Sequence, residues 1–213
     1  MFNASAALRE ALFGNAPEAR RSATAALELS KGRDVEYGAG LAFAFAGDSS
    51  RAQAIVNDLE KRFPEDTEVQ FTYAPVIHAA IALNPADPNR GEPSRAIELL
   101  QPTVAYELGA PMSSITAFFG ALYPVYVRGE AYLAAHEGTE AAAEFQKVLG
   151  HRGVVLNDPI GALARLQLGR ALAMSGDKIK AKATYQDFLN LWKDADADIP
   201  IFKQAKAEYA APQ

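Results

Sequence analysis

The sequence contains no cysteine among its 213 residues. A chain without thiols forms no disulfide and offers no thiolate to a metal ion, so disulfide-stapled folds and cysteine zinc sites are excluded. Histidine is scarce as well, and the chain has only His78, His136 and His151. The pair His136-Glu137 is not followed by the second histidine of the zinc-protease motif. We therefore expect no zinc site.

Positive charge is also in short supply. The chain has 21 lysines and arginines against 26 aspartates and glutamates, a net charge of −5 and a pI near 5.3. A nucleic-acid-binding surface needs a basic face, and so does a surface that binds anionic lipids. No apolar run is long enough to cross a membrane. The start, MFNASAALREALFG, lacks the basic region of a secretion signal. We expect no nucleic-acid partner and no membrane insertion.

Motifs for catalysis or cofactor binding are missing too. Asp194, Asp196 and Asp198 have the spacing of a calcium loop, but Ile199 stands where that loop needs glycine and Ala205 where it needs glutamate. There is no Gly-rich phosphate loop and no Gly-x-Ser-x-Gly elbow. We therefore expect a protein that is not an enzyme, with no catalytic, cofactor-binding or metal-binding residues and no cofactor.

The sequence is rich in amphipathic helix. In the stretch 160–192, apolar residues recur at helical spacing on both sides of a Ser-Gly-Asp turn at 175–177. Gly169 is followed twelve positions later by Ala181, and Tyr185 lies one turn further on the same face. Small residues allow two helices to approach closely, and a short turn makes them antiparallel neighbours. The stretch therefore predicts a helical hairpin.

The same pattern recurs along the chain. Copies with the same offsets are Gly129, Ala141 and Phe145; Gly40, Ala52 and Val56; and, more weakly, Ala7, Ala19 and Ala23. The anchor alanines Ala19, Ala52, Ala96, Ala141 and Ala181 are 33, 44, 45 and 40 residues apart. A period of this length is typical of a solenoid of helical hairpins.

These positions resemble the tetratricopeptide repeat (TPR), with its small residue, large residue, alanine, second large residue and closing proline. The matching residues are Gly129, Tyr132, Ala141 and Phe145; Gly169, Leu172, Ala181 and Tyr185; and Gly40, Phe43, Ala52, Val56 and Pro64. The segments LYPVYVRGEAYLAA, VVLNDPIGALA and LWKDADADIP resemble the carboxy-terminal TPR regions of large bacterial serine/threonine kinases or transcriptional regulators. Because the first helix begins inside a repeat, we expect the chain to be a piece of a longer protein.

The resemblance implies an all-α, right-handed solenoid of about five hairpins, forming one domain over residues 1–213. The units are roughly 3–30, 34–64, 66–108, 114–150 and 158–193, followed by a capping helix over 198–210. It also implies a protein-interaction module, the scaffold or sensor part of a bacterial signalling protein, that binds a peptide or protein segment in its concave groove. The expected compartment is the cytoplasm, or the periplasm if the chain is attached to a membrane-anchored kinase.

In the TPR family the first helix of each hairpin lines the groove. Carried over, the groove candidates are Tyr37, Leu41, Phe45, Phe71, His78, Tyr123, Tyr126, Glu130, Leu166 and Arg170. Tyrosines offer apolar area with a hydrogen-bonding tip, which binding surfaces favour. The alternative for each aromatic residue is that neighbouring helices cover its side chain. The lysines and asparagines of the TPR carboxylate clamp are not found at the positions of Tyr37, Leu41, Tyr126 and Glu130, so we expect apolar and aromatic contacts to hold a ligand.

Three features depart from the repeat. The loop 84–93 holds three prolines and is the place where a small-molecule site would be built, which is the least favoured alternative. Pro75 predicts a kink or a late helix start, and Pro124 predicts a kink, because proline removes one helical hydrogen bond. The segment from Ile115 to Leu122 is too apolar for a solvated face. It packs in the core or, as an alternative function, associates two copies of the chain.

Overall fold

A computed structural model describes residues 1–84, 92–109 and 122–210. Within these ranges the chain is helical and contains no strand. Most of the predicted loop at 84–93 and of the apolar segment Ile115–Leu122 lies outside the described residues. Of that segment, Leu122 is described, and it is fully buried. The helices are α1 (Phe2–Leu12), α2 (Ala16–Leu29), α3 (Arg33–Phe45), α4 (Ser49–Arg62), α5 (Ala74–Ala82), α6 (Pro93–Leu99), α7 (Tyr123–Ala134), α8 (Gly138–Gly150), α9 (Arg152–Val155), α10 (Pro159–Met174), α11 (Lys178–Leu191) and α12 (Pro200–Ala210).

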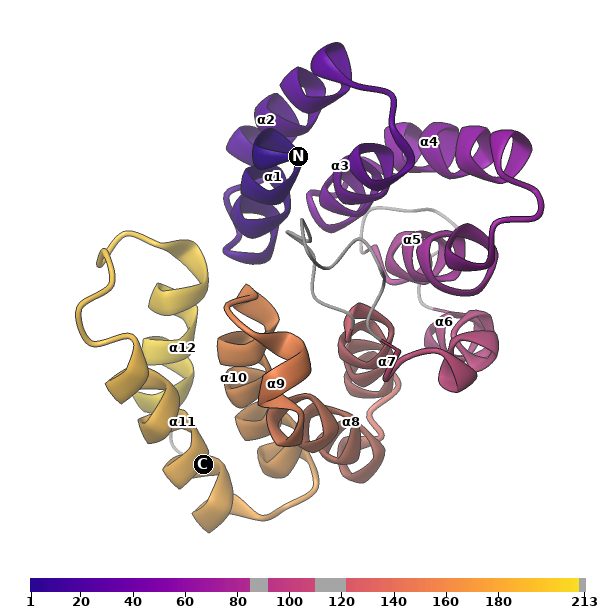
Figure 1. Cartoon of the computed structure of the whole chain (residues 1–213). Helices are drawn as coiled ribbons and strands as arrows, with labels where there is room; N and C mark the ends of the chain where they lie inside the picture. Colours follow the sequence, from indigo (N-terminus) through magenta and orange to yellow (C-terminus); the bar gives the residue numbers. More distant parts are fainter. Residues whose placement is uncertain (85–91, 110–121, 211–213) are drawn as a thin grey trace.

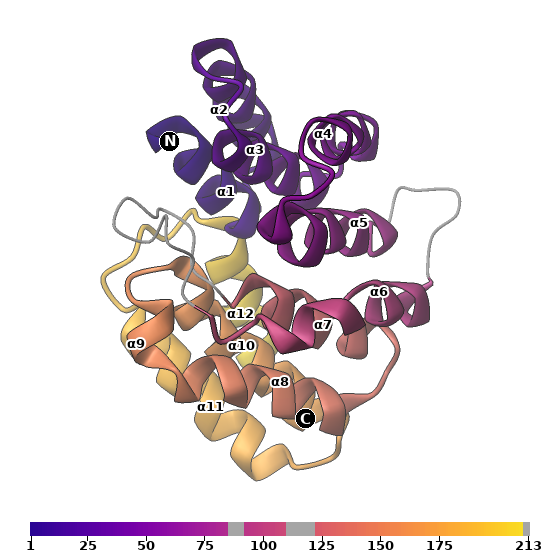
Figure 2. The same cartoon turned by 45° about the vertical axis from the view of Figure 1, so that its right-hand side comes forward.

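The helices pack against their neighbours in sequence. The pairs are α1 with α2, α3 with α4, α5 with α6, α7 with α8 and α10 with α11. The first helix of each pair also packs against the first helix of the next, as α1 with α3, α3 with α5, α5 with α7 and α7 with α10. Figure 1 shows the pairs arranged around a ring, with these first helices on the inside and the second helices outside. In Figure 2 the helices α1 to α5 lie above α7 to α11, and α6 lies beside α7.

Close helix contacts lie at the glycines that the repeat pattern marks. A β-carbon added at Gly129 would lie 2.7 Å from the ring of Phe145, and one added at Gly169 would lie 3.2 Å from the ring of Tyr185. Glycine at these two positions therefore lets an aromatic side chain of the second helix rest on the backbone of the first. The small-then-large pairing read from the sequence is confirmed at both hairpins.

The two inner prolines behave differently from a simple kink. A π-helical turn, Val69–Tyr73, precedes α5, and Pro75 lies in the first turn of that helix. Proline has no N–H to donate, and the chain leaves regular α-helical hydrogen bonding in the turn that precedes it. Pro124 does not kink a helix within the described residues, because α7 begins at Tyr123 and the proline lies in its first turn. The predicted link at 151–159 contains the short helix α9.

A buried ion cluster holds residues 101–108 against α7 and α8. The Arg128 guanidinium donates to Glu107 at 2.8 Å and to Glu144 at 2.6 Å, and Lys147 contacts the second oxygen of Glu107. The side chains of Arg128 and Glu107 are only 4% and 1% exposed. Such groups remain charged inside a protein only when they are paired, so the cluster fixes this segment in one position.

The last helix joins the two ends of the chain. Ile201 of α12 donates its backbone N–H to the carbonyl of Phe13, which follows α1, at 3.1 Å. The rings of Phe13 and Trp192 meet edge to face with their centroids 5.0 Å apart. The predicted capping helix over 198–210 is therefore present as α12, and it contacts the first hairpin as well as the last.

None of the helices in the described part of the chain combines the length and the apolar character needed to cross a membrane.

Candidate functional site

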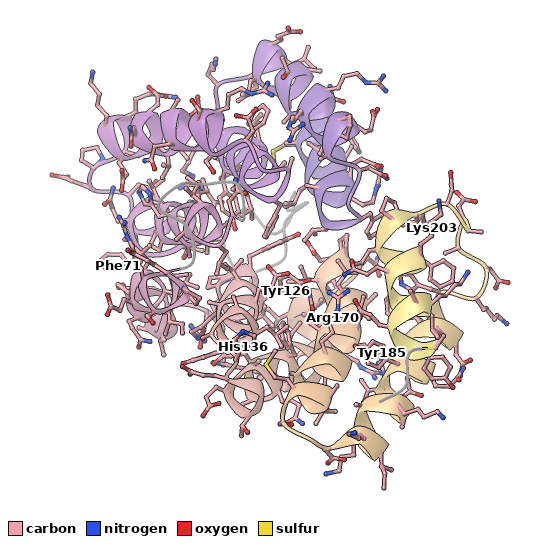
Figure 3. The ribbon with its side chains drawn as sticks, turned by 180° about the vertical axis from the view of Figure 1, so that it is seen from behind. Phe71, Tyr126, His136, Arg170, Tyr185 and Lys203 are labelled. Carbon is pink, nitrogen blue, oxygen red and sulfur yellow. The ribbon has the colours of Figure 1, made fainter. Side chains whose placement is uncertain are left out.

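Two first helices bring four polar side chains together on the inner side of the ring. Tyr126 and Glu130 lie one turn apart on α7, and Gln167 and Arg170 lie one turn apart on α10, so each pair shares a helix face. Figure 3 shows Tyr126 and Arg170 on the side of their helices that faces the middle of the ring. We call these four side chains the inner-face network.

Gln167 connects the network. Its amide nitrogen lies 3.1 Å from a carboxylate oxygen of Glu130 and 3.3 Å from the hydroxyl of Tyr126. Its amide oxygen accepts a hydrogen bond from Arg170 at 3.0 Å. One glutamine therefore links three groove candidates that lie on two helices. The sequence reading missed Gln167, and the signal was a polar residue within the apolar run of α10.

Arg170 extends the network to α12. Its guanidinium donates two hydrogen bonds to the carboxylate of Glu208, at 2.9 and 2.8 Å. The hydroxyl of Tyr185 donates to the same carboxylate at 3.1 Å. A bidentate pair of this kind is stronger and more directional than a pair between single atoms. Glu208 therefore fixes the orientation of Arg170 at the edge of the inner face.

The carboxyl group of Glu130 is perturbed by its surroundings. Burial raises its pKa from 4.5 to about 7, while hydrogen bonds with Tyr126 and Gln167 and the charge of Arg170 act in the opposite direction. Burial also raises the pKa of Tyr126 well above its ordinary value, so its hydroxyl stays protonated. The network thus offers a carboxyl group that changes charge near neutral pH, beside neutral donors and one fixed cation.

Five groove candidates are covered by their neighbours. Each of these residues is at most 2% exposed, and they are Tyr37, Leu41, Tyr123, Tyr126 and Leu166. Tyr37 stacks on Tyr73 with centroids 3.9 Å apart. Tyr123 donates its hydroxyl hydrogen bond to Asp158, the N-cap of α10, at 2.9 Å. These residues contribute to the core in this structure, and Glu130 and Arg170 are the more accessible part of the network.

The remaining candidates lie apart from the network. Phe45 is partly buried. Phe71 is 39% exposed and stacks on Tyr106, with centroids 5.0 Å apart. His78 lies 3.3 Å from Glu60 of α4. It lines a pocket of about 350 Å³ between α4, α5 and α6, together with Gln53, Ile81, Ala82, Glu92, Arg95 and Leu99.

A second pocket lies between α2, α3 and α4. Its volume is about 510 Å³, and its apolar walls come from Leu27, Phe43 and Ile55. The guanidinium of Arg51 lies over the ring of Phe43, 4.1 Å from its centroid. The sequence reading did not find this pocket, because two of its three helices, α2 and α4, are second helices, which the repeat pattern treats as the outer side.

Among the residues described, no three histidine, aspartate or glutamate side chains are grouped so as to hold a metal ion. The inner-face network is an arrangement of hydrogen-bond donors and acceptors around one titratable carboxyl group. Compared with models of known families, with curated proteins and with solved structures, the chain matches none of them.

Proposed function

We propose that the chain is a TPR-like solenoid that acts as a non-enzymatic protein-interaction module and binds a peptide or protein segment at its inner face. The single observation that carries the proposal is the inner-face network, in which Glu130, Gln167 and Arg170 present polar groups from two adjacent first helices. Solenoids use the inner face of stacked helices as an extended binding surface. By the resemblance to bacterial TPR regions, we place this module in a signalling protein, as its scaffold or sensor part.

The packing of the helices supports the proposal. Each first helix contacts both its own partner and the next first helix, which is how hairpins stack in a solenoid. The covered tyrosines change the expected mode of binding. Because Tyr37, Tyr123 and Tyr126 are buried, hydrogen bonds that Glu130 accepts and Arg170 donates contribute more to recognition than aromatic contacts do.

The test is a selection from a random peptide library on the immobilised 213-residue chain. The affinity of each selected peptide is then measured by calorimetry for the wild type and for Glu130→Gln. Glu140→Gln is the matched control, because Glu140 is exposed on α8 and makes the same chemical change outside the network. Glutamine replaces a charged acceptor by a neutral one. Hydrogen bonds to charged groups are worth about 1.5–3 kcal/mol and those between neutral groups about 1 kcal/mol, so we expect affinity for Glu130→Gln to fall about tenfold above about pH 7, where Glu130 is ionised.

The control variant is expected to bind as the wild type does. Peptides that bind all three proteins equally would contradict an inner-face site. A library that yields no binding peptide would contradict the interaction function itself.

A further inference from the structure

The helix α12 is attached lightly. Of its 11 residues, Phe202 and Ala205 are buried, and Ile201 and Tyr209 are partly buried against the core. The segment 193–199 that tethers it to α11 is mostly exposed. A helix with few buried apolar contacts and an exposed tether opens at a lower free energy than the core of a protein. The opening of α12 therefore costs less free energy than the opening of a helix in the core.

The surface beneath α12 is specific in its chemistry. Near the start of the helix, Trp192 contacts the ring of Phe202 with centroids 5.9 Å apart, and it also contacts Phe13 and Phe188. Near the end of the helix, Arg170 and Tyr185 both bind the carboxylate of Glu208. We call this surface the α12 seat, made of Phe13, Arg170, Tyr185, Phe188 and Trp192.

The α12 seat contacts one side of α12. Phe202, Ala205 and Glu208 are three residues apart in turn, which places them on one side of an α-helix. Phe202 packs against the aromatic rings of the seat, Ala205 is fully buried, and the carboxylate of Glu208 binds Arg170. Recognition of an amphipathic helix by its apolar side, with a charged contact to fix its register, is a common mode of protein interaction.

We propose that α12 is a detachable latch, and that its seat docks an amphipathic helix of a partner protein with the same pattern. The pattern is an aromatic residue, a small residue three positions later and a carboxylate three positions after that. The native α12 is the built-in competitor, held at a high effective concentration by its tether. This proposal extends the proposed interaction function to a second surface, and the two surfaces share Arg170.

The probe is a fluorescein-labelled synthetic peptide with the sequence of residues 198–210, titrated into full-length protein. In the wild type the tethered helix competes with it. Phe202→Ala weakens the latch without changing the seat, so we expect the labelled peptide to bind this variant at least ten times more tightly than the wild type. Phe71→Ala is the matched control, because it makes the same change at an exposed ring far from the seat, and it is expected to behave as the wild type does.

A second peptide tests the charged contact. A probe in which the residue equivalent to Glu208 is lysine is expected to lose binding to the Phe202→Ala protein. Equal binding of the native peptide to wild type and Phe202→Ala would overturn the latch. Equal binding of the two peptides would overturn the register that Arg170 is proposed to set.

Two measurements guard against misfolding and against a different occupant. Trp192 is the single tryptophan of the chain, so a shift of its emission to longer wavelength, with a loss of helical circular dichroism no larger than the share of α12, reports release of α12 in a folded protein. Glu208→Gln is the milder variant if Phe202→Ala does not fold, and it is expected to show the same trend.

A dimer formed by exchange of α12 between copies, seen by light scattering, would overturn the choice of a partner helix. Failure of this test leaves Glu130-dependent peptide binding untouched, because Phe202 lies outside the inner-face network.

Discussion

Replacing Glu130 with glutamine is expected to stabilise the protein above neutral pH. Burial holds the pKa of this carboxyl group at about 7, whereas its ordinary value is 4.5. Glutamine has nearly the same shape and its amide oxygen still accepts the hydrogen bond from Gln167. The substitution therefore removes the cost of a buried charge while it keeps the packing of the network.

The sign of the effect follows from proton binding. Between pH 4.5 and about 7 the folded protein keeps a proton on Glu130 that the unfolded chain has lost, so stability falls as pH rises through this window. Above the window the loss is complete and amounts to about 3 kcal/mol. Glutamine does not titrate. The variant is therefore expected to match the wild type near pH 4.5 and to exceed its free energy of unfolding by up to about 3 kcal/mol at pH 8.

The assay is urea unfolding of both proteins at several pH values from 4.5 to 8, followed by circular dichroism. The difference between the two proteins isolates Glu130, because the other titrating groups are common to both. Glu140→Gln makes the same chemical change at an exposed residue outside the network and is the control. A constant difference between wild type and Glu130→Gln over this range would refute the reasoning, since it would mean that the carboxyl group is ionised throughout.

Three further substitutions test the packing. Arg128→Met leaves the buried Glu107 without its guanidinium partner, so we expect a loss of about 3 kcal/mol in urea unfolding, part of which Glu107→Gln restores in the double variant. Gly129→Ala places a β-carbon 2.7 Å from the ring of Phe145 and is expected to lower stability by about 1–3 kcal/mol; Gly150→Ala, where an added β-carbon meets nothing within 4 Å, is the control, and equal stability of the two variants would contradict close packing. Tyr123→Phe removes the hydrogen bond to the α10 N-cap Asp158 and is expected to lower the thermal midpoint by an amount equivalent to about 1 kcal/mol.

Much of the helical layout could be predicted from the sequence, because hairpin contacts are local. Gly129 with Phe145 and Gly169 with Tyr185 lie sixteen residues apart and carry their own signal of small and large residues. The pattern was less exact in the second hairpin. An added β-carbon at Gly40 would meet Ile77 at 3.0 Å and Ile55 at 3.1 Å, and Val56, which the repeat pattern marks, is not among these neighbours.

The candidate site was only partly predictable, because a periodic pattern says which residues share a face but not what covers that face. Tyr126, Glu130 and Arg170 were expected on the inner side, and the structure joins them through Gln167. His78 was expected among them, yet it pairs with Glu60 of α4. The π-helical turn before α5 rotates the following residues relative to a regular helix, so a register counted at 3.6 residues per turn fails there.

No pattern in the sequence predicted the contact between the end of the chain and the first hairpin. Phe13 and Trp192 meet although nearly the whole chain separates them, and neither residue belongs to a repeat position that the pattern marks. A solenoid extends when its last helix leaves an apolar face uncovered. Here α12 turns that face toward the first hairpin, since Ile201 bonds to Phe13 while Glu208 bonds to Arg170. The contact between Glu208 and Arg170 also lies at the edge of the inner face, so a variant that releases α12 would change the partners of a residue in the inner-face network.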